Sequence, residues 1–208
     1  FNTRITNLSS SFVTLAQLVM RETNFTEGEM NFIMDSMPIV VASAKRSSTA
    51  RVAADICDKG YCGSKGTYYY GVKLHLLSEK QNHTLPLPRD VVISRASEHD
   101  LSVSKDYLES WYNINVFADK AYCDDKWKNE LAEHGVNLIT PIKLTKGQDK
   151  LSFFAALFNE AVSSARQAIE SFFSWLVEKT GINSASKVRS SCGLIAFIFA
   201  RLAAAFYS

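Results

Sequence analysis

The chain has 208 residues, of which 47% are hydrophobic and 21% charged, and this composition excludes a disordered chain and favours one globular domain with a proper core. The net charge is only +2, but residues 43–73 carry six bases against two acids, and residues 179–208 carry four bases and no acid. Two basic segments on a nearly neutral protein are typical either of solvated faces or of contacts with an acidic partner such as a phosphate backbone.

The first part of the chain predicts one helix and two strands. Apolar residues recur at helical spacing over 10–22. Residues 30–42 form an apolar run in which Pro38 disfavours a helix and indicates a strand. An irregular segment rich in Ser, Gly, Lys and Arg follows over 43–66, and the aromatic and aliphatic residues of 67–79 predict the second strand.

Strands and helices alternate in the middle of the chain. Further strands are predicted over 91–97, 114–119 and 136–143, with helices over 98–111 and 124–135 between them. This order predicts an α/β fold with a mixed five-stranded sheet flanked by helices.

Two apolar helices complete the predicted elements. The longer one ends at Gly181, a residue type that often stops helices, and the second begins near residue 184. Residues 193–207 are the most membrane-like stretch, but they are short for a span and have Arg201 in their middle. We therefore expect a buried terminal helix and no membrane partner.

The cysteines and the N-terminus bear on the compartment and on the domain boundary. The four cysteines lack the spacing of a zinc site, which favours reduced thiols in a cytoplasmic protein. No signal peptide is visible, and the chain starts at Phe1 instead of Met, so we expect its N-terminal region to be incomplete.

Three acidic residues lie where the local pattern argues against a charge. Asp35 is inside an apolar run, Asp119 ends an apolar strand, and Glu170 is on an apolar helix. Each acid alone is also typical of a capped or paired structural residue, but a carboxylate in or beside a core is costly unless it is paired or bound to metal. Because strand ends gather at one edge of an α/β sheet, the three acids together predict a hard oxygen site for two Mg²⁺ or Mn²⁺ ions.

Asp124 and Asp125 follow Asp119 closely but are interpreted differently. They stand at the start of the predicted helix DDKWKNELAEHG. Aspartates are favoured there because they cap the first turn and complement the helix dipole. We expect these two acids to be structural and to lie away from Asp35 and Glu170.

Four stretches between residues 30 and 205 resemble the DDE transposases of bacterial insertion sequences, whose catalytic core is ribonuclease H-like. In chain order they are FIMDSMPI with Asp35, KGYCGSKGTYYYGVKLHLL with Tyr70, Gly71, Lys73 and His75, FADKAY with Asp119, and ARQAIESFFSWL with Arg166 and Glu170. Each motif alone is weak, whereas four in this order on these elements are specific. The chain departs from many relatives at Ser163 and Val177, where they carry Tyr and Lys, and Lys179 is out of register.

The resemblance implies a function and a domain division. Residues 31–208 are expected to be a ribonuclease H-like DDE catalytic domain, and residues 1–30 a remnant of a helical region that recognises element ends. The implied activity is Mg²⁺-dependent DNA cleavage at those ends and strand transfer into target DNA, with Asp35, Asp119 and Glu170 as catalytic residues and metal ligands.

The implied partner is double-stranded DNA, both the terminal inverted repeats of the element and the target. Pairing of two ends calls for a homodimer, although the sequence indicates no dimer surface. The implied location is the bacterial cytoplasm, in association with the nucleoid.

Several further residues are candidates for DNA contact or support. The proposed DNA contacts are Lys73, Lys120, Arg166, Lys65 and Arg46, and the supporting residues are His75 and Tyr122. Plainer interpretations stay open for some of them: a surface ion pair for Arg166, a solvated side chain for Lys120, a hydrogen-bonded core residue for His75 and a packed core residue for Tyr122.

Two other functions stay open. The chain could be a truncated, non-mobilising DNA-binding remnant, because we expect its N-terminal region to be incomplete. It could also be another ribonuclease H-like DNA nuclease, such as a repair or junction-cutting enzyme. Inverted repeats flanking the gene distinguish the first from a mobile element, and joined products distinguish the second.

Overall fold

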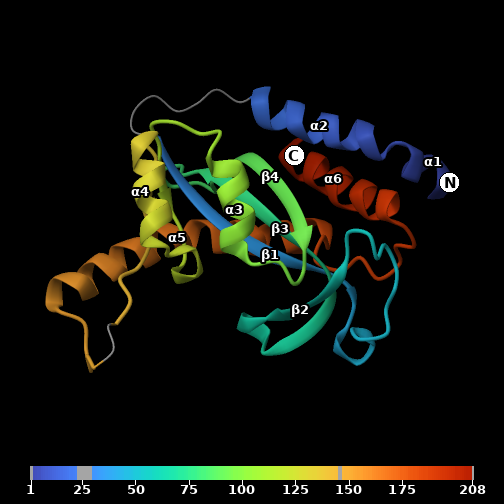
Figure 1. Ribbon diagram of the computed structural model, residues 1–208. Helices are drawn as coiled ribbons and strands as arrows, with labels where there is room; N and C mark the ends of the chain where they lie inside the picture. The colour runs from blue at the N-terminus through green and yellow to red at the C-terminus, as the bar shows by residue number, and fades with distance from the viewer. Residues whose placement is uncertain (1, 23–29, 145–146, 208) are drawn as a thin grey trace.

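A mixed six-stranded sheet with helices on both faces forms the centre of this computed structural model, which describes residues 2–22, 30–144 and 147–207 (Figure 1). The strands are β1 Asn31–Ala42, β2 Asp58–Cys62, β3 Thr67–Glu79, β4 Leu87–Arg95, β5 Asn115–Phe117 and β6 Asn137–Ile139. The α-helices are α1 Asn2–Asn7, α2 Ser9–Glu22, α3 Asp100–Leu108, α4 Asp125–Glu133, α5 Phe153–Thr180 and α6 Ser191–Tyr207.

The strand order combines an antiparallel half and a parallel half. Hydrogen-bonded neighbours follow the order β2-β3-β1-β5-β6, and β4 also pairs with β3. β1, β2 and β4 run antiparallel to β3, whereas β5 and β6 continue the sheet parallel to β1. The predicted α/β class with a mixed sheet flanked by helices is confirmed, with six strands in place of five.

The sixth strand, β2, lies inside the segment that the sequence predicts to be irregular. It forms a hairpin with β3 through the short 3₁₀ turn Gly63–Lys65, and Gly66 adopts a left-handed φ of 59° at its end. Gly71 of β3 pairs with Val40 of β1 on one side and with Asp58 of β2 on the other. β2 and β4 therefore occupy the same edge of β3, one after the other.

Side chains of β1 alternate between two hydrophobic cores, as the period of two in a strand requires. Ile33, Met37 and Ile39 belong to one core, together with buried residues of α5 and α6. Phe32 and Met34 belong to the other core, which contains Leu108 at the end of α3 and Trp127 and Leu131 of α4. Any polar residue on β1 therefore faces a known set of helices.

Helix α5 begins and ends with typical capping residues. The Ser152 hydroxyl accepts a hydrogen bond from the Ala155 amide, and Gly181 ends the helix with a left-handed φ of 61°. Val162, Ile169, Phe172 and Leu176 form its buried face. Its N-terminal end extends past the sheet (Figure 1), where Phe153 and Phe154 are 76% and 80% exposed.

Helices α2 and α6 pack together at the other end of the molecule (Figure 1). The helix predicted over 10–22 is confirmed as α2, and the break expected after it, over 23–29, lies outside the described residues. α6 is the predicted buried helix, although it begins at Ser191 and not near residue 184. The Arg201 guanidinium donates a hydrogen bond from Nε to the Thr180 carbonyl over 3.0 Å. Among the described residues, no helix combines the length and apolar character that crossing a membrane requires.

Asp119, Asp124 and Asp125 lie after the end of β5. This strand ends at Phe117, so Asp119 follows the strand end by two residues and caps a 3₁₀ turn over Lys120–Tyr122. The structural role predicted for Asp124 is confirmed, because its carboxylate caps α4 by accepting a hydrogen bond from the Trp127 amide over 3.1 Å. Asp125 lies in the first turn of the same helix.

Candidate active site

Asp35 lies in the middle of β1 on the face that α5 covers. It has the same parity as Ile33 and Met37, so its side chain lies on the face of the sheet whose core contains Ile169. Its Oδ1 accepts a hydrogen bond from the Ser36 amide over 2.8 Å. Asp35 is a charged residue inside a central strand, and the surrounding structure must supply its other partners.

The register between β1 and β5 places Asp119 beside Asp35. β5 is the parallel neighbour of β1, and Ile33 pairs with Phe117. Asp35 follows Ile33 by two residues, and Asp119 follows Phe117 by two residues. The pairing of the two strands therefore places the two acids side by side. Asp119 is fixed by its capping role, since its Oδ1 accepts a hydrogen bond from the Lys120 amide over 2.6 Å.

Helix α5 adds Glu170 and the cation that joins the three acids. The Arg166 guanidinium lies 3.2 Å from Asp35 Oδ2 and 3.5 Å from Asp119 Oδ1. It also lies 3.9 Å from Glu170 Oε1, one helical turn further on. Arg166 is therefore the shared counter-ion of three carboxylates from three separate elements.

Exposure and electrostatics differ among these groups. The side chains of Arg166 and Asp35 are 13% and 20% exposed, whereas that of Glu170 is 63% exposed. The pKa of Asp35 is raised to about 6, chiefly by burial and to a smaller extent by the neighbouring Asp119 carboxylate, while the Ser36 amide and the Arg166 guanidinium oppose the rise. The site is thus a cluster of negative charge held together by one partly buried cation.

The acids open onto a surface cleft of about 700 Å³. Asp35, Asp119 and Glu170 line it, together with Arg166 and with Lys65, which comes from the 3₁₀ turn between β2 and β3. Val177 also lines the cleft, where a lysine of many relatives would project. Lys65 therefore lies at the same cleft as the acids, as a DNA contact would require.

The donor set suits a divalent metal ion in kind. All three side chains offer carboxylate oxygen, which Mg²⁺ and Mn²⁺ prefer, and all three converge on one cation. Over the described ranges, no three His, Cys, Asp or Glu side chains are spaced to share one ion in this conformation. The three carboxylates instead surround the Arg166 guanidinium, which is wider than a single metal ion.

Lys73 and His75 lie on the opposite face of the sheet from Asp35, because they pair with Pro38 and Ser36 of β1, whose side chains alternate with that of Asp35. Lys73 Nζ donates to Asp100 Oδ1 and to the Glu98 carbonyl, each over 2.7 Å. His75 is buried, and its Nε2 is 2.8 Å from Ser94 Oγ, which places it as a hydrogen-bonded core residue. Burial lowers the pKa of His75 to about 4. The structure therefore does not bring these two residues together with the three acids.

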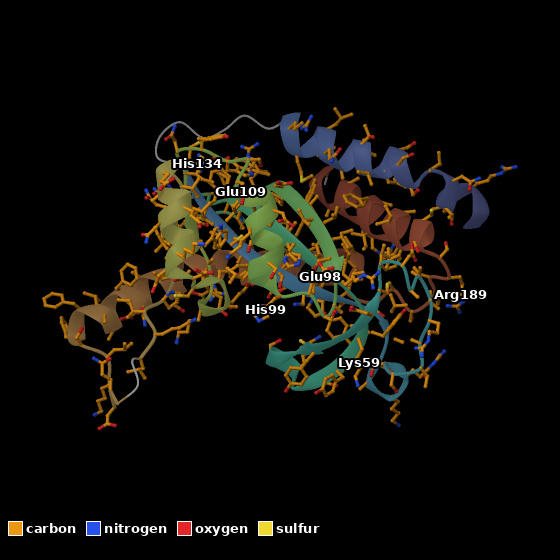
Figure 2. The ribbon with its side chains drawn as sticks, in the orientation of Figure 1. Lys59, Glu98, His99, Glu109, His134 and Arg189 are labelled. Carbon is orange, nitrogen blue, oxygen red and sulfur yellow. The ribbon has the colours of Figure 1, made fainter. Side chains whose placement is uncertain are left out.

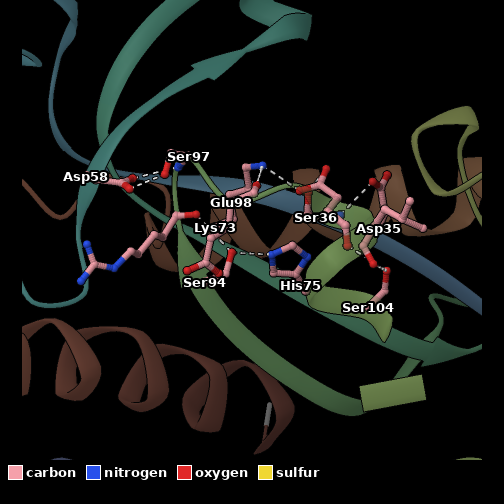
Figure 3. Close-up of polar contacts among 12 residues, drawn as sticks. Asp35, Ser36, Asp58, Lys73, His75, Ser94, Ser97, Glu98 and Ser104 are labelled. Carbon is pink, nitrogen blue, oxygen red and sulfur yellow. Dashed lines mark hydrogen bonds and ion pairs between the residues drawn. The ribbon is translucent and has the colours of Figure 1, made fainter. Parts of the chain in front are cut away.

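Ser36 joins the two faces and was not singled out from the sequence (Figure 3). Its amide donates to Asp35, while its hydroxyl donates to Asp100 Oδ2 over 3.2 Å. The Lys73–Asp100 ion pair thus lies one residue behind the candidate site. A serine beside an acid within an apolar run is the only sequence signal for this link, and it is a weak one.

The other candidates occupy three different surroundings. Tyr122 is 1% exposed and packs in the core beneath α3 and α4, which favours its packing role. Lys120 is exposed beside Asp119. Arg46 lies away from the acids, in a second hollow formed by the segment after β1 and the segment before α6. The structure groups Asp35, Asp119, Glu170, Arg166 and Lys65, and it separates them from Lys73, His75, Tyr122 and Arg46.

Comparisons with known proteins identify the family of the chain. No curated protein sequence matches the chain. A cryo-EM structure of the piggyBac transposase synaptic complex with hairpin DNA is similar over 92% of this chain, with 6% identity and a TM-score of 0.48, and the chain spans about half the length of that protein. The profile of the family described as the transposase DDE domain matches residues 27–206, which is most of the sequence. The chain therefore belongs to the family of transposase DDE domains.

Proposed function

We propose that this chain is the catalytic domain of a transposase that cleaves DNA at the ends of a mobile element and joins those ends to target DNA. One observation carries the proposal: Asp35, Asp119 and Glu170 come from a strand, a strand end and a helix and converge on Arg166 in one cleft. Residues 31–208 would form this domain, and residues 1–30 would belong to a region that recognises element ends.

Divalent metal ions belong to the proposal because the family generally uses them. Asp35, Asp119 and Glu170 would hold two Mg²⁺ or Mn²⁺ ions. When bound, such ions supply activation of the attacking oxygen and stabilisation of the leaving oxygen in an in-line displacement.

The proposed reaction has two displacements at phosphorus. In the first, a water oxygen bonds to the phosphorus at the element end, the bond to the 3′ oxygen breaks, and a 3′-hydroxyl is released. In the second, this 3′ oxygen attacks a target phosphodiester and displaces the target's own 3′ oxygen. The cations that line the cleft, Arg166 and Lys65, would bind the phosphate oxygens and align the duplex.

The test compares Asp119→Asn with Asp125→Asn, which removes an equal charge from the first turn of α4. With the native flanking DNA and Mg²⁺, we expect Asp119→Asn to lose at least about a hundredfold of end cleavage, because it removes a carboxylate at the reacting centre. Asp125→Asn should cleave like the unchanged protein. If Asp119→Asn cleaves as well as its control, the assignment of the acids is wrong.

The products also separate the proposal from its alternatives. Strand-transfer products with a defined end sequence are expected from a transposase, and cut but unjoined DNA from another ribonuclease H-like nuclease. Joining of two ends further calls for a homodimer with bound DNA, which light scattering of the protein with paired ends would detect. A protein that binds DNA but forms neither product is the non-mobilising remnant.

A further inference from the structure

The two basic segments of the sequence meet in a second hollow, separate from the carboxylate cleft. Arg46 and Arg51 follow β1, and Arg189 precedes α6, yet all three line one cavity of about 510 Å³. Arg189 lies at the edge of the molecule beside the segment that follows β1 (Figure 2). We call this cavity the arginine hollow.

The charge of the arginine hollow is not neutralised within the described residues. None of its three arginines forms an ion pair there, and no acidic residue lines the cavity. Its other polar lining consists of four hydroxyl side chains, those of Ser43, Thr49, Ser184 and Ser186. Guanidinium and hydroxyl donors without a carboxylate are the groups that bind phosphate oxygens.

Backbone carbonyls hold two of these arginines in place. Arg51 Nη1 donates to the Ala50 carbonyl over 2.8 Å and to that of Ser48 over 3.3 Å. Arg189 Nη1 donates to the Val188 carbonyl over 2.9 Å and to that of Ser186 over 3.1 Å. Each guanidinium is thus fixed by one end and keeps further N–H donors for a ligand.

The arginine hollow adjoins the carboxylate cleft along β1. Pro38 and Asn183 line the cleft, and Val40 and Ser184 line the hollow. Between them, the chain before α6 is joined to β1 by hydrogen bonds from the Val40 amide to the Asn183 carbonyl and from the Ala185 amide to the Val40 carbonyl, over 2.9 and 2.8 Å. Val41 lies six positions after Asp35 along the strand, a distance of about 20 Å.

We propose that the arginine hollow binds the phosphate backbone of the duplex whose scissile bond lies at Asp35, Asp119 and Glu170. The inference rests on the proposed function and adds a second contact point. At 3.4 Å per base pair, the spacing of about 20 Å corresponds to roughly six base pairs between the cut and the phosphates bound by the hollow. A rigid backbone that reaches both places fixes the register of the DNA and specifies no base.

The test measures duplex binding without catalysis. Fluorescence anisotropy of a labelled duplex of about 30 base pairs, in EDTA, is followed between about 50 and 200 mM salt. The variant is Arg46→Gln with Arg189→Gln, and the charge-matched control is Lys126→Gln with Lys150→Gln, both at exposed sites away from the hollow. Arg46→Gln alone is a second variant, since the Arg46 side chain forms no hydrogen bond with the described residues and its loss does not threaten the fold.

The expected result is a smaller salt dependence. The slope of log affinity against log salt should fall by about two for the double arginine variant and by about one for Arg46→Gln, with binding at least about tenfold weaker for the former. Arg46→Lys with Arg189→Lys should retain the slope, and the lysine control should match the unchanged protein.

Each contrary result has its own meaning. Equal slopes for the arginine variant and the unchanged protein overturn the inference about the hollow and leave the cleavage test with Asp119→Asn unaffected. An unchanged protein that binds no duplex in EDTA overturns both the hollow and the proposed function. An equal loss in the lysine control assigns the effect to total charge and also overturns the hollow.

Discussion

Arg166 is the residue on which the candidate site depends in this conformation. Its two terminal nitrogens contact carboxylates of Asp35, Asp119 and Glu170, and its side chain is 13% exposed. A cation in that position offsets the mutual repulsion of three negative groups, one of which is largely buried. Divalent ions bound by the same acids would offset the same repulsion. The guanidinium and the metal ions would therefore neutralise the same three carboxylates.

Neutralisation of the carboxylates by either cation predicts how Arg166→Met behaves. In EDTA near pH 8, above the pKa of about 6 of Asp35, we expect the free energy of unfolding to fall by about 1–3 kcal/mol, because the carboxylates around Arg166 lose their partner. About 10 mM Mg²⁺ should then stabilise the variant more than the unchanged protein, since the ion binds only the folded site. Urea unfolding followed by tryptophan fluorescence measures both quantities.

The control for Arg166→Met is Lys105→Met, which removes the more exposed Lys105–Asp124 ion pair at the start of α4. It should cost at most about 1 kcal/mol and leave the Mg²⁺ effect unchanged. Equal stabilisation by Mg²⁺ in Arg166→Met and in the unchanged protein would contradict a shared role of guanidinium and metal.

His75 makes stability depend on pH from the other face of the sheet. Burial lowers its pKa from the ordinary 6.5 to about 4, with smaller opposing effects of Asp100, which raises it, and Lys73, which lowers it. Between these two values the unfolded chain takes up a proton that the folded chain does not. The free energy of unfolding therefore falls as pH drops from about 6.5 to about 4, by up to about 3 kcal/mol from this residue.

The pKa of Asp35, raised to about 6, acts in the opposite direction over part of the same window, because the folded chain takes up that proton first. The His75 contribution is therefore isolated by comparing His75→Gln with the unchanged protein in urea unfolding at a series of pH values. We expect the variant to lose less stability on acidification. His134→Gln, at an exposed site, should follow the unchanged protein, and parallel curves for His75→Gln would refute the prediction.

At the scale of elements, the pairing of β1 with β3 positions Asp35, and Gly71 is the residue that this pairing requires. A Cβ built on Gly71 would lie 2.0 Å from the Ile39 carbonyl oxygen, which is backbone and unable to turn away. The glycine in the Tyr-Gly-x-Lys-x-His stretch therefore has a packing reason. Its absence of a side chain permits the close approach of the two strands.

Gly71→Ala should separate β1 from β3 and lower the free energy of unfolding by about 3 kcal/mol or more. Gly63→Ala is the matched control, because a Cβ at Gly63 would meet nothing within 4 Å and its φ is not left-handed. Thermal unfolding by circular dichroism measures both variants. Similar melting temperatures for the two would contradict a steric role for Gly71.

The elements also show which parts of the fold were predictable. Five strands were predicted because their apolar residues stand out from polar surroundings. Asp58–Cys62 is short and polar, so β2 was missed, although the turn sequence GSKG between it and β3 was a usable hairpin signal. Strand ends were overextended around β5, where Asp119 belongs to a 3₁₀ turn.

The candidate site was predictable in part for a different reason. Asp35, Asp119 and Glu170 were identified as charges in apolar surroundings, which is a local property of the sequence. The face of the sheet on which Lys73 lies cannot be inferred from the local sequence, because it depends on the pairing of Ser36 with His75 across two strands. For the same reason, the meeting of Arg46 and Arg189 in one hollow was not visible from their positions in the chain.

At the scale of the whole molecule, the N-terminal helix α2 is part of the same packed unit as the candidate site. Ala16 is fully buried in the core that also contains Ile33 of β1 and Ile169 of α5. α2 packs on α6 and also contacts β4, and α6 in turn contacts α5 (Figure 1). Loss of this packing should therefore destabilise the whole domain.

Ala16→Glu and Leu15→Glu test this connection with neighbouring residues of one helix. Ala16 is 0% exposed and Leu15 is 47% exposed, so the same carboxylate is buried without a partner at one position and solvated at the next. We expect Ala16→Glu to lower the urea midpoint of the entire domain by an amount equivalent to several kcal/mol, and Leu15→Glu to change it by less than about 1 kcal/mol. Tryptophan fluorescence reports on α4 and α5, because Trp127 and Trp175 lie in these helices. A midpoint unchanged by Ala16→Glu would mean that α2 detaches without disturbing the site, and the N-terminal helix would then be an appendage of the catalytic domain.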